Sequence, residues 1–275
     1  MFTKPLSTII EMLSGDTYDT PEDTHRFIGD RIFLNSRWWF YIRFLRVLFK
    51  SSWSARRGTF DTLRWIQTSH AIFKDIEGCG GRFHIKGLDN LKKSDEPLVI
   101  VSNHMSTLET MVFPGIIAPF RNVNFVVKDV LVKGLVFGPI ISSRNPIVVS
   151  RKNAFDDFRI VLAKGEEILN NRFSLIIFPQ STRSLDFVPK KFNTLGIKLA
   201  KKVGVKVLPT AIKTDYWGSG KILKGFGVIN RNKPIHIEFG EPIEIKGNGK
   251  EEHERIIEFI TSRLEQWGGA VSLDN

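Results

Sequence analysis

Short runs of apolar residues alternate with amphipathic stretches along the chain from residue 82 onward. The apolar runs are rich in Val, Ile and Phe, as buried strands are, whereas the stretches between them repeat apolar residues every three or four positions, as helices do. Strands that alternate with helices predict an α/β fold, with a mostly parallel central sheet and helices on both sides. The predicted strands are residues 82–87, 98–101, 124–128, 146–151, 174–179 and 205–209, and the predicted helices are residues 108–117, 155–169, 195–202 and 251–267.

Some positions in this pattern predict edges and breaks. The alternation over residues 82–87 is typical of an edge strand, and two further β segments, residues 225–228 and 235–239, are also expected at the edge of the sheet. Pro114 should kink or shorten its helix, and Gly165 should interrupt the helix over residues 155–169. Residues 134–138 are expected to form a helix or turn that Pro139 closes.

The first 78 residues differ in composition from the rest. Residues 1–30 predict a short helix and a polar arm, and residues 31–50 combine aromatic and aliphatic side chains with five basic residues and no acid. On a helix, Arg43, Arg46 and Lys50 share one side, and the other sides carry Trp38, Trp39, Ile42, Leu45 and Phe49. This arrangement suits a helix that lies among anionic lipid headgroups, followed by a second helix over residues 60–76. The alternative is a hairpin packed on the domain with snorkelling Arg side chains.

The Gly-rich stretch 78–81 is the predicted domain boundary. It separates an N-terminal arm and amphipathic, membrane-associating helical hairpin (1–78) from an α/β domain (79–275). Because no stretch of 18 uncharged apolar residues occurs, no membrane-spanning helix is expected, and no signal peptide is recognised.

The charge balance indicates an anionic partner. The chain has 40 Lys and Arg against 29 Asp and Glu, a formal net charge of +11, which suits nucleic acid, an anionic lipid surface or a phosphorylated substrate. Interleaved Arg and aromatic residues could stack on single-stranded nucleic acid, but no groove-reading motif accompanies them and no nucleic-acid partner is predicted. The single cysteine, Cys79, excludes an internal disulfide framework, and Cys and His are too scattered for a metal site.

The stretch over residues 98–109 carries the first candidate chemistry. An apolar strand ends in Ser102-Asn103-His104, and Glu109 follows five residues after the histidine. On one helix these two side chains would lie about 140° apart, so they meet only if His104 precedes the helix and Glu109 reaches back from its first turn. A carboxylate placed in this way orients an imidazole that acts as a base. The alternative is a capping box between Ser106 and Glu109, with a purely structural role.

A second polar motif follows the strand over residues 174–179. It contains Gln180, Ser181, Thr182 and Arg183, and the planar guanidinium of the arginine can bind two oxygens of one phosphate. Two other predicted strands end in basic residues, Lys128 and Arg151.

Together these motifs resemble the glycerolipid acyltransferase superfamily, and most closely its 1-acylglycerol-3-phosphate acyltransferases. The resemblance rests on the order His104-x4-Glu109, Ile147-Val148-Val149-Ser150-Arg151, Phe178-Pro179-Gln180-Ser181-Thr182-Arg183-Ser184 and Val207-Leu208-Pro209 within residues 82–245. The family usually has Asp where this chain has Glu109, and Glu-Gly where it has Gln180-Ser181. These departures indicate a divergent branch.

The resemblance implies transfer of a fatty acyl group from acyl-CoA or acyl-carrier protein to the free hydroxyl of 1-acylglycerol 3-phosphate, giving phosphatidic acid. His104 and Glu109 would be catalytic, and the substrate-binding residues would be Lys128, Arg151, Gln180, Ser181, Thr182 and Arg183. No cofactor or metal is implied beyond the acyl thioester co-substrate. The expected partners are lysophospholipid and anionic membrane lipids, and the expected location is the cytoplasmic face of the inner or plasma membrane, as a peripheral protein. The alternatives are another acceptor (glycerol 3-phosphate, a different lysophospholipid or an aminolipid) and a non-catalytic membrane-binding homologue.

Overall fold

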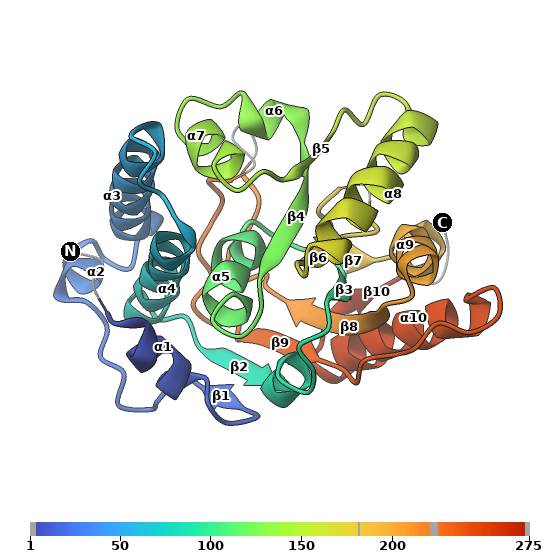
Figure 1. The fold of residues 1–275 in the computed structure, drawn as a ribbon. Coiled ribbons are helices and arrows are strands. Elements are labelled where there is room, and N and C mark those ends of the chain that lie inside the picture. Colours follow the sequence, from blue (N-terminus) through green and yellow to red (C-terminus); the bar gives the residue numbers. More distant parts are fainter. Residues whose placement is uncertain (1–3, 181, 221–224, 273–275) are drawn as a thin grey trace.

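The computed structural model of the chain describes residues 4–180, 182–220 and 225–272. Within these residues an eight-stranded sheet runs through the molecule (Figure 1), with the strand order β1-β2-β9-β8-β3-β6-β4-β5. Its strands are β1 (Tyr18–Asp19), β2 (Phe83–Lys86), β3 (Leu98–Ser102), β4 (Val123–Lys128), β5 (Ile147–Val149), β6 (Ser174–Ile177), β8 (Lys206–Lys213) and β9 (Ile235–Phe239). A separate parallel pair is formed by β7 (Asp186–Phe187) and β10 (Ala270–Val271).

The sheet is mostly parallel, which confirms the predicted α/β fold. The strands β8, β3, β6, β4 and β5 all run in one direction, while β9 is antiparallel to β8 and parallel to β2. In the centre, β3 is buried at every position. A strand covered on both faces has no polar side to present, which explains its continuous run of Val and Ile.

The predictions about the sheet's edges were wrong. β2 is not an edge strand, because the short antiparallel β1 pairs with its outer side. β9 lies inside the sheet between β2 and β8, and residues 225–228 form no strand, with only an isolated bridge between Trp217 and Ile229 nearby. Alternation shows that one face of a strand is less buried, and β9 has that pattern in the interior of the sheet.

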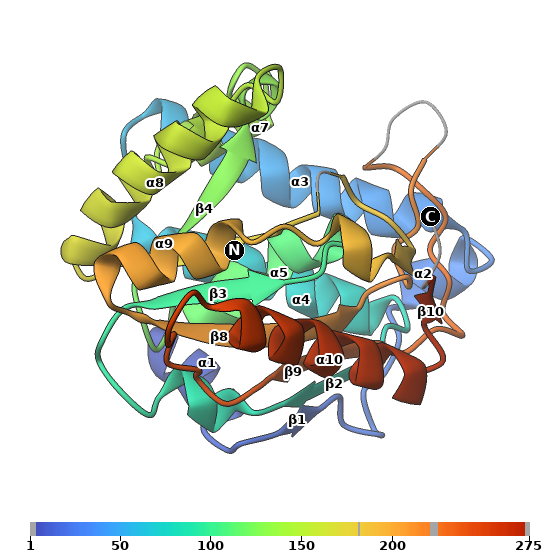
Figure 2. The same ribbon diagram turned by 90° about the vertical axis from the view of Figure 1, so that its right-hand side faces the viewer.

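Helices cover both faces of the sheet (Figures 1 and 2). On one face lie α4 (Thr62–Gly78) and α5 (Leu108–Ile117), and on the other lie α8 (Ala154–Asn170), α9 (Leu195–Val203) and α10 (Lys250–Gln266). The shorter helices α1 (Leu6–Met12) and α2 (Ile28–Ile32) and the longer α3 (Arg37–Arg56) lie beside α4, and α6 (Asp129–Val132) and α7 (Phe137–Ser142) follow β4.

Two expected helix breaks did not occur. α8 continues through Gly165, where a Cβ atom would come within 2.7 Å of the Leu199 side chain, so this glycine lets α8 and α9 approach closely. Pro139 lies within α7 rather than closing it, and a proline in the first turn of a helix removes no hydrogen bond.

Pro114 does not shorten its helix, which continues to Ile117, and α4 compensates for the proline. Pro114 lies inside α5 and has no N–H to donate. The Ser69 hydroxyl of α4 donates to the carbonyl of Met111 at 2.6 Å and accepts from the N–H of Gly115 at 2.7 Å. A Cβ atom at position 115 would lie 2.9 Å from this hydroxyl oxygen, so glycine keeps the two helices in contact.

The long helix α3 presents three different sides. Phe40, Phe44 and Val47 are buried in the core, and Arg43, Arg46 and Lys50 share a second side, as predicted. The third side is exposed and apolar, with Trp38 (60% exposed), Ile42 (50%), Phe49 (57%) and Trp53 (58%). Among the described residues, no helix combines the length and apolarity needed to cross a membrane.

Candidate active site

The candidate site lies at the carboxyl end of β3, in the loop that leads into α5. Asn103 anchors this loop to β8, because its side chain donates to the carbonyl of Ile212 and accepts from the N–H of the same residue, both at 2.9 Å. The Asn103 side chain thus makes the pair of hydrogen bonds to β8 that a strand backbone would make, one residue beyond Ser102, the last paired residue of β3. Side chains that follow such a strand end lie where open α/β sheets bind their ligands.

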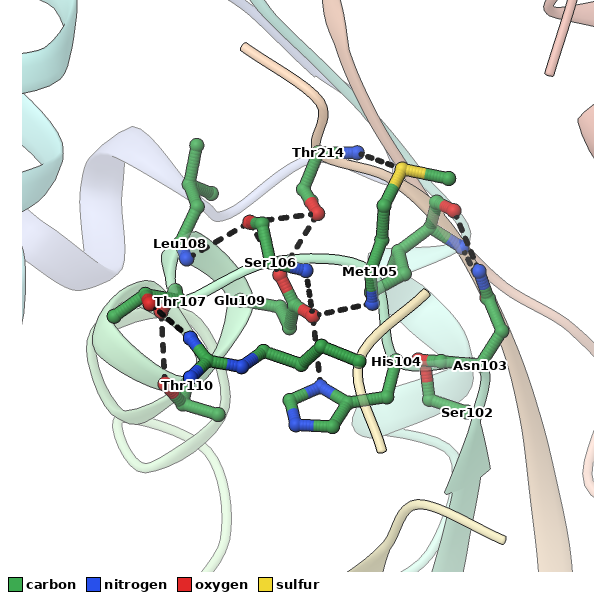
Figure 3. A network of polar contacts seen from close by, with 12 residues as sticks. Ser102, Asn103, His104, Met105, Ser106, Thr107, Leu108, Glu109, Thr110 and Thr214 are labelled. Carbon is green, nitrogen blue, oxygen red and sulfur yellow. Dashed lines mark hydrogen bonds and ion pairs between the residues drawn. The ribbon is translucent and has the colours of Figure 1, made fainter. Parts of the chain in front are cut away.

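His104 and Glu109 meet as predicted. The distance from Nδ1 of His104 to Oε1 of Glu109 is 2.9 Å, and Figure 3 shows the ring and the carboxylate facing each other across the loop. The imidazole lies before the helix and the carboxylate reaches back from its first turn. With Nδ1 donating to the carboxylate, Nε2 on the opposite side of the ring carries the lone pair that accepts a proton.

Glu109 is fully buried and surrounded by hydrogen-bond donors. Its Oε1 also accepts from the backbone N–H groups of Met105 and Ser106, each at 2.8 Å, and its Oε2 lies 2.9 Å from the Ser106 hydroxyl and 2.7 Å from the Thr214 hydroxyl (Figure 3). Burial would raise the pKa of Glu109, but the hydrogen bond and charge of His104 and the Thr214 hydroxyl hold it below its ordinary value. The carboxylate therefore stays ionised at neutral pH.

Part of the capping interpretation is also confirmed, because Glu109 binds backbone N–H groups at the start of its own helix. The N–H of Ser106 donates to Glu109, as in a capping box, but the Ser106 hydroxyl accepts from the N–H of Leu108 at 3.0 Å and not from that of Glu109, so the box is incomplete. One carboxylate thus starts α5 and contacts the imidazole at the same time. A fixed helix start gives the carboxylate the rigid position that an orienting group needs.

The loop after β6 makes hydrogen bonds to both the N–H and the carbonyl of His104. The Gln180 side-chain oxygen accepts from the N–H of His104 at 2.7 Å, and the N–H of Ser184 donates to the His104 carbonyl at 3.0 Å. The ring of Phe178 stacks on the imidazole, with 4.2 Å between ring centroids. The sequence predicts Gln180 as a substrate-binding residue, whereas its side-chain oxygen here positions His104.

Arg183 and Arg151, two of the predicted substrate-binding cations, make different contacts near this loop. Arg183 donates from its guanidinium to the Thr107 hydroxyl just before α5. Arg151 follows β5, where its N–H and that of Ser150 both donate to the Asp157 carboxylate. Partial burial lowers the pKa of Arg151, Asp157 opposes this shift, and the positive charge of Arg183 adds to it, so the two guanidinium groups lie within electrostatic reach of each other.

Two other predicted substrate-binding residues, Lys128 and Thr182, make fewer contacts. Lys128 ends β4 and is exposed, as is Thr182; within the part of the chain that the structure describes, neither side chain makes a hydrogen bond or ion pair. Ser181 lies outside the described residues. No group of three or more His, Cys, Asp or Glu side chains suited to a metal ion occurs among the residues described.

Thr214 is the residue that sequence reasoning missed. It follows β8, and its hydroxyl contacts Glu109 across 105 positions in the sequence. The carboxyl ends of parallel strands meet at one edge of the sheet, but the predicted strand over residues 205–209 ended four residues before β8 does, so the sequence did not show that Thr214 lies at that edge.

Comparisons with known proteins show which proteins the chain is similar to. Residues 82–213 match the family model described as Acyltransferase. The chain is 29% identical over 189 residues to the 1-acyl-sn-glycerol-3-phosphate acyltransferase of Pseudomonas aeruginosa, a match that covers 68% of each chain. It is also 29% identical to a chloroplastic 1-acyl-sn-glycerol-3-phosphate acyltransferase of Arabidopsis thaliana over 56% of this chain, which spans 44% of the plant protein.

A solved structure shares the fold. The crystal structure of the 1-acyl-sn-glycerophosphate acyltransferase PlsC from Thermotoga maritima aligns with 86% of this chain and 96% of its own, with a TM-score of 0.59 and 22% sequence identity.

Proposed function

We propose that the chain, whose residues 82–213 match the Acyltransferase family model and which is similar to a 1-acyl-sn-glycerol-3-phosphate acyltransferase, transfers a fatty acyl group from an acyl thioester to the free hydroxyl of 1-acylglycerol 3-phosphate, giving phosphatidic acid. The observation that carries this proposal is the contact between His104 and the buried, ionised Glu109 inside a matched acyltransferase region. The names of its relatives point to the acceptor.

The chemistry follows from the orientation of the ring. Nε2 of His104 takes the proton of the acceptor hydroxyl as its oxygen attacks the thioester carbonyl, and Glu109 stabilises the imidazolium that forms. The carbon–sulfur bond then breaks, and the departing thiolate takes the proton back from the imidazolium. The new ester is the second acyl bond of phosphatidic acid, the acyl carrier leaves as a free thiol, and no acyl group is attached to the enzyme.

The acceptor phosphate would lie near Arg183 and Arg151. Two guanidinium groups that repel each other gain from an anion between them, and Arg binds phosphate oxygens in pairs. Arg183 contacts Thr107 at the start of the helix that carries Glu109, so a phosphate held there would place its hydroxyl near the imidazole. Holding two reactants in this way lowers the entropic barrier of the transfer.

The direct test follows the release of free thiol from acyl-CoA in the presence of 1-acylglycerol 3-phosphate, with phosphatidic acid identified by mass spectrometry. We expect His104→Ala to lose at least about a hundredfold in kcat, the lower range for general-base catalysis, while the protein stays folded. His84→Ala is the matched control, because His84 pairs with Asp19 away from the site. Near-normal turnover by His104→Ala, or faster acylation of glycerol 3-phosphate than of 1-acylglycerol 3-phosphate, would contradict the proposal.

We also propose that the protein lies peripherally on the cytoplasmic face of the inner or plasma membrane, where acyl donors are soluble. The support is the exposed apolar side of α3, since side chains such as Trp38, Ile42 and Phe49 rarely cluster on a surface that contacts only water. Ile42→Ser with Phe49→Ser should reduce flotation with anionic vesicles, whereas Phe155→Ser, a change at a 67% exposed residue of α8, should not. Equal flotation of all three proteins would refute this location.

A further inference from the structure

A basic cleft separate from the candidate active site is lined by residues of α1, α3 and α4. Figure 1 shows these three helices on the side of the molecule where the N-terminus lies. The cleft has a volume of about 260 Å³, and none of its lining residues belongs to the loops over 98–110 or 178–184. Among the described residues, the carboxylate of Asp75 and five cationic side chains line it. The cations are Lys4, Arg43, Arg46, Lys50 and Lys74.

The acidic groups nearby offset only part of this charge. Arg43 donates to Asp75 at 2.7 Å, and Lys74 forms an ion pair with Glu77 at 2.7 Å. Among the described residues, Asp75 and Glu77 are the carboxylates paired with these cations, and Lys4 and Arg46 add positive charge beyond those two pairs. Such a concave, cationic surface attracts anions.

A second, independent observation comes from His70. This residue lines the cleft and is only 6% exposed, and its Nε2 has no hydrogen-bond partner among the residues that the structure describes. Burial lowers the pKa of His70 to about 4, so the ring is neutral at physiological pH. Leaving a buried polar atom unpaired is destabilising, and native structures rarely keep one without a reason, such as a ligand that completes it. An imidazole that carries its hydrogen on Nε2 can donate to an anionic oxygen.

We propose that this cleft is a second anion site, which binds the phosphate of an anionic phospholipid headgroup through its cationic side chains and Nε2 of His70. The inference rests on the membrane location proposed above, and it assigns to this cleft a lipid that is not the substrate.

The surroundings favour a lipid over a free phosphate. Arg43, Arg46 and Lys50 lie on the side of α3 next to the exposed stripe of Ile42 and Phe49, so a phosphate in the cleft would lie beside a surface suited to acyl chains. The volume of about 260 Å³ is below the roughly 300–1,000 Å³ of typical ligand pockets. It therefore suits a headgroup whose chains remain in the bilayer.

The test uses the full-length protein and dihexanoyl phosphatidylglycerol below its micelle concentration, with binding located by hydrogen–deuterium exchange. We expect protection over α1 and α4. Lys4→Gln with Arg46→Gln, both exposed residues, should weaken binding about thirtyfold, since each basic residue near anionic lipid contributes roughly a factor of five. Arg37→Gln with Arg57→Gln removes the same charge outside the cleft and should weaken it far less.

His70→Leu separates a ligand role from a structural role. It should raise the melting temperature or leave it unchanged, because it removes an unpaired buried atom, and it should still abolish the protection over α4. Protection that survives in both cleft variants would overturn the proposal. Equal protection by inorganic phosphate or by CoA would overturn its assignment to lipid.

These outcomes are independent of the proposed catalytic function, because exchange needs no turnover. A wild-type protein that binds dihexanoyl phosphatidylglycerol in the cleft but releases no thiol from acyl-CoA would refute acyl transfer alone.

Discussion

The most informative single substitution is Glu109→Gln. The amide has nearly the shape of the carboxylate, and its oxygen can keep the three N–H donors that now meet at Oε1, those of His104, Met105 and Ser106. Its NH₂ group would then face the hydroxyls of Ser106 and Thr214, which can turn to accept. The fold should tolerate this change, so that the main loss is the negative charge beside the imidazole.

The magnitude follows from the hydrogen bond that this charge strengthens. Hydrogen bonds to charged groups contribute about 1.5–3 kcal/mol, and the 2.9 Å contact between Glu109 and His104 gains this strength when the ring becomes a cation during the transfer. Each 1.36 kcal/mol corresponds to a factor of ten in rate. We therefore expect kcat to fall roughly 10- to 150-fold, with little change in KM.

The assay is steady-state thiol release with 1-acylglycerol 3-phosphate as acceptor, together with thermal unfolding of each variant. Glu252→Gln is the matched control, since Glu252 is also buried and also accepts a backbone N–H, that of Lys246, but lies outside the site. A Glu109→Gln enzyme that is folded and keeps kcat within twofold would refute the orienting role. A similar loss in Glu252→Gln would show that the effect is structural.

Three further predictions concern other residues. Gln180→Glu keeps an acceptor for the His104 N–H and should retain activity, whereas Gln180→Leu should lower kcat about tenfold with KM nearly unchanged; equal kinetics would show that this contact is dispensable. Arg183→Gln should raise KM for 1-acylglycerol 3-phosphate about tenfold or more but not KM for acyl-CoA, and a parallel rise in both would argue against a phosphate contact. Because burial, with two lysines nearby, lowers the pKa of His70 to about 4, its neutral form stabilises the fold fully above pH ~6.5, and this stabilisation is lost as pH falls toward 4. His70→Leu should therefore reduce the fall in unfolding free energy between pH 7 and pH 4 by up to about 3 kcal/mol. An unchanged pH dependence of the unfolding free energy, measured by chemical denaturation, would contradict this.

Local patterns predicted the centre of this structure well. The apolar run before His104 is a strand buried at every position, and the spacing of His104 and Glu109 led to their contact, because both belong to one strand–loop–helix unit. The capping and orienting interpretations of Glu109 were posed as alternatives, but a single oxygen, Oε1, accepts from the backbone N–H groups of Met105 and Ser106 and from Nδ1 of His104 at the same time.

Contacts between distant segments were not predictable in the same way. Thr214 reaches Glu109, and Gln180 reaches the His104 backbone, only because β8 and β6 both lie next to β3. No local pattern encodes the strand order that brings them together. The role of Gly165 was unpredictable for the same reason, because its missing side chain leaves room for Leu199 of another helix.

The Ser69 hydroxyl that completes α5 around Pro114 has a practical consequence for protein engineering. A fragment trimmed to residues 82–213, the region that matches the family model, would lose this hydroxyl and expose α5, the helix that contains Pro114 and carries Glu109. A chimera that receives its N-terminal hairpin from another acyltransferase would have to import a serine at this position and keep a glycine at 115. Replacing the N-terminal hairpin would therefore disturb α5, whatever the hairpin contacts outside the protein.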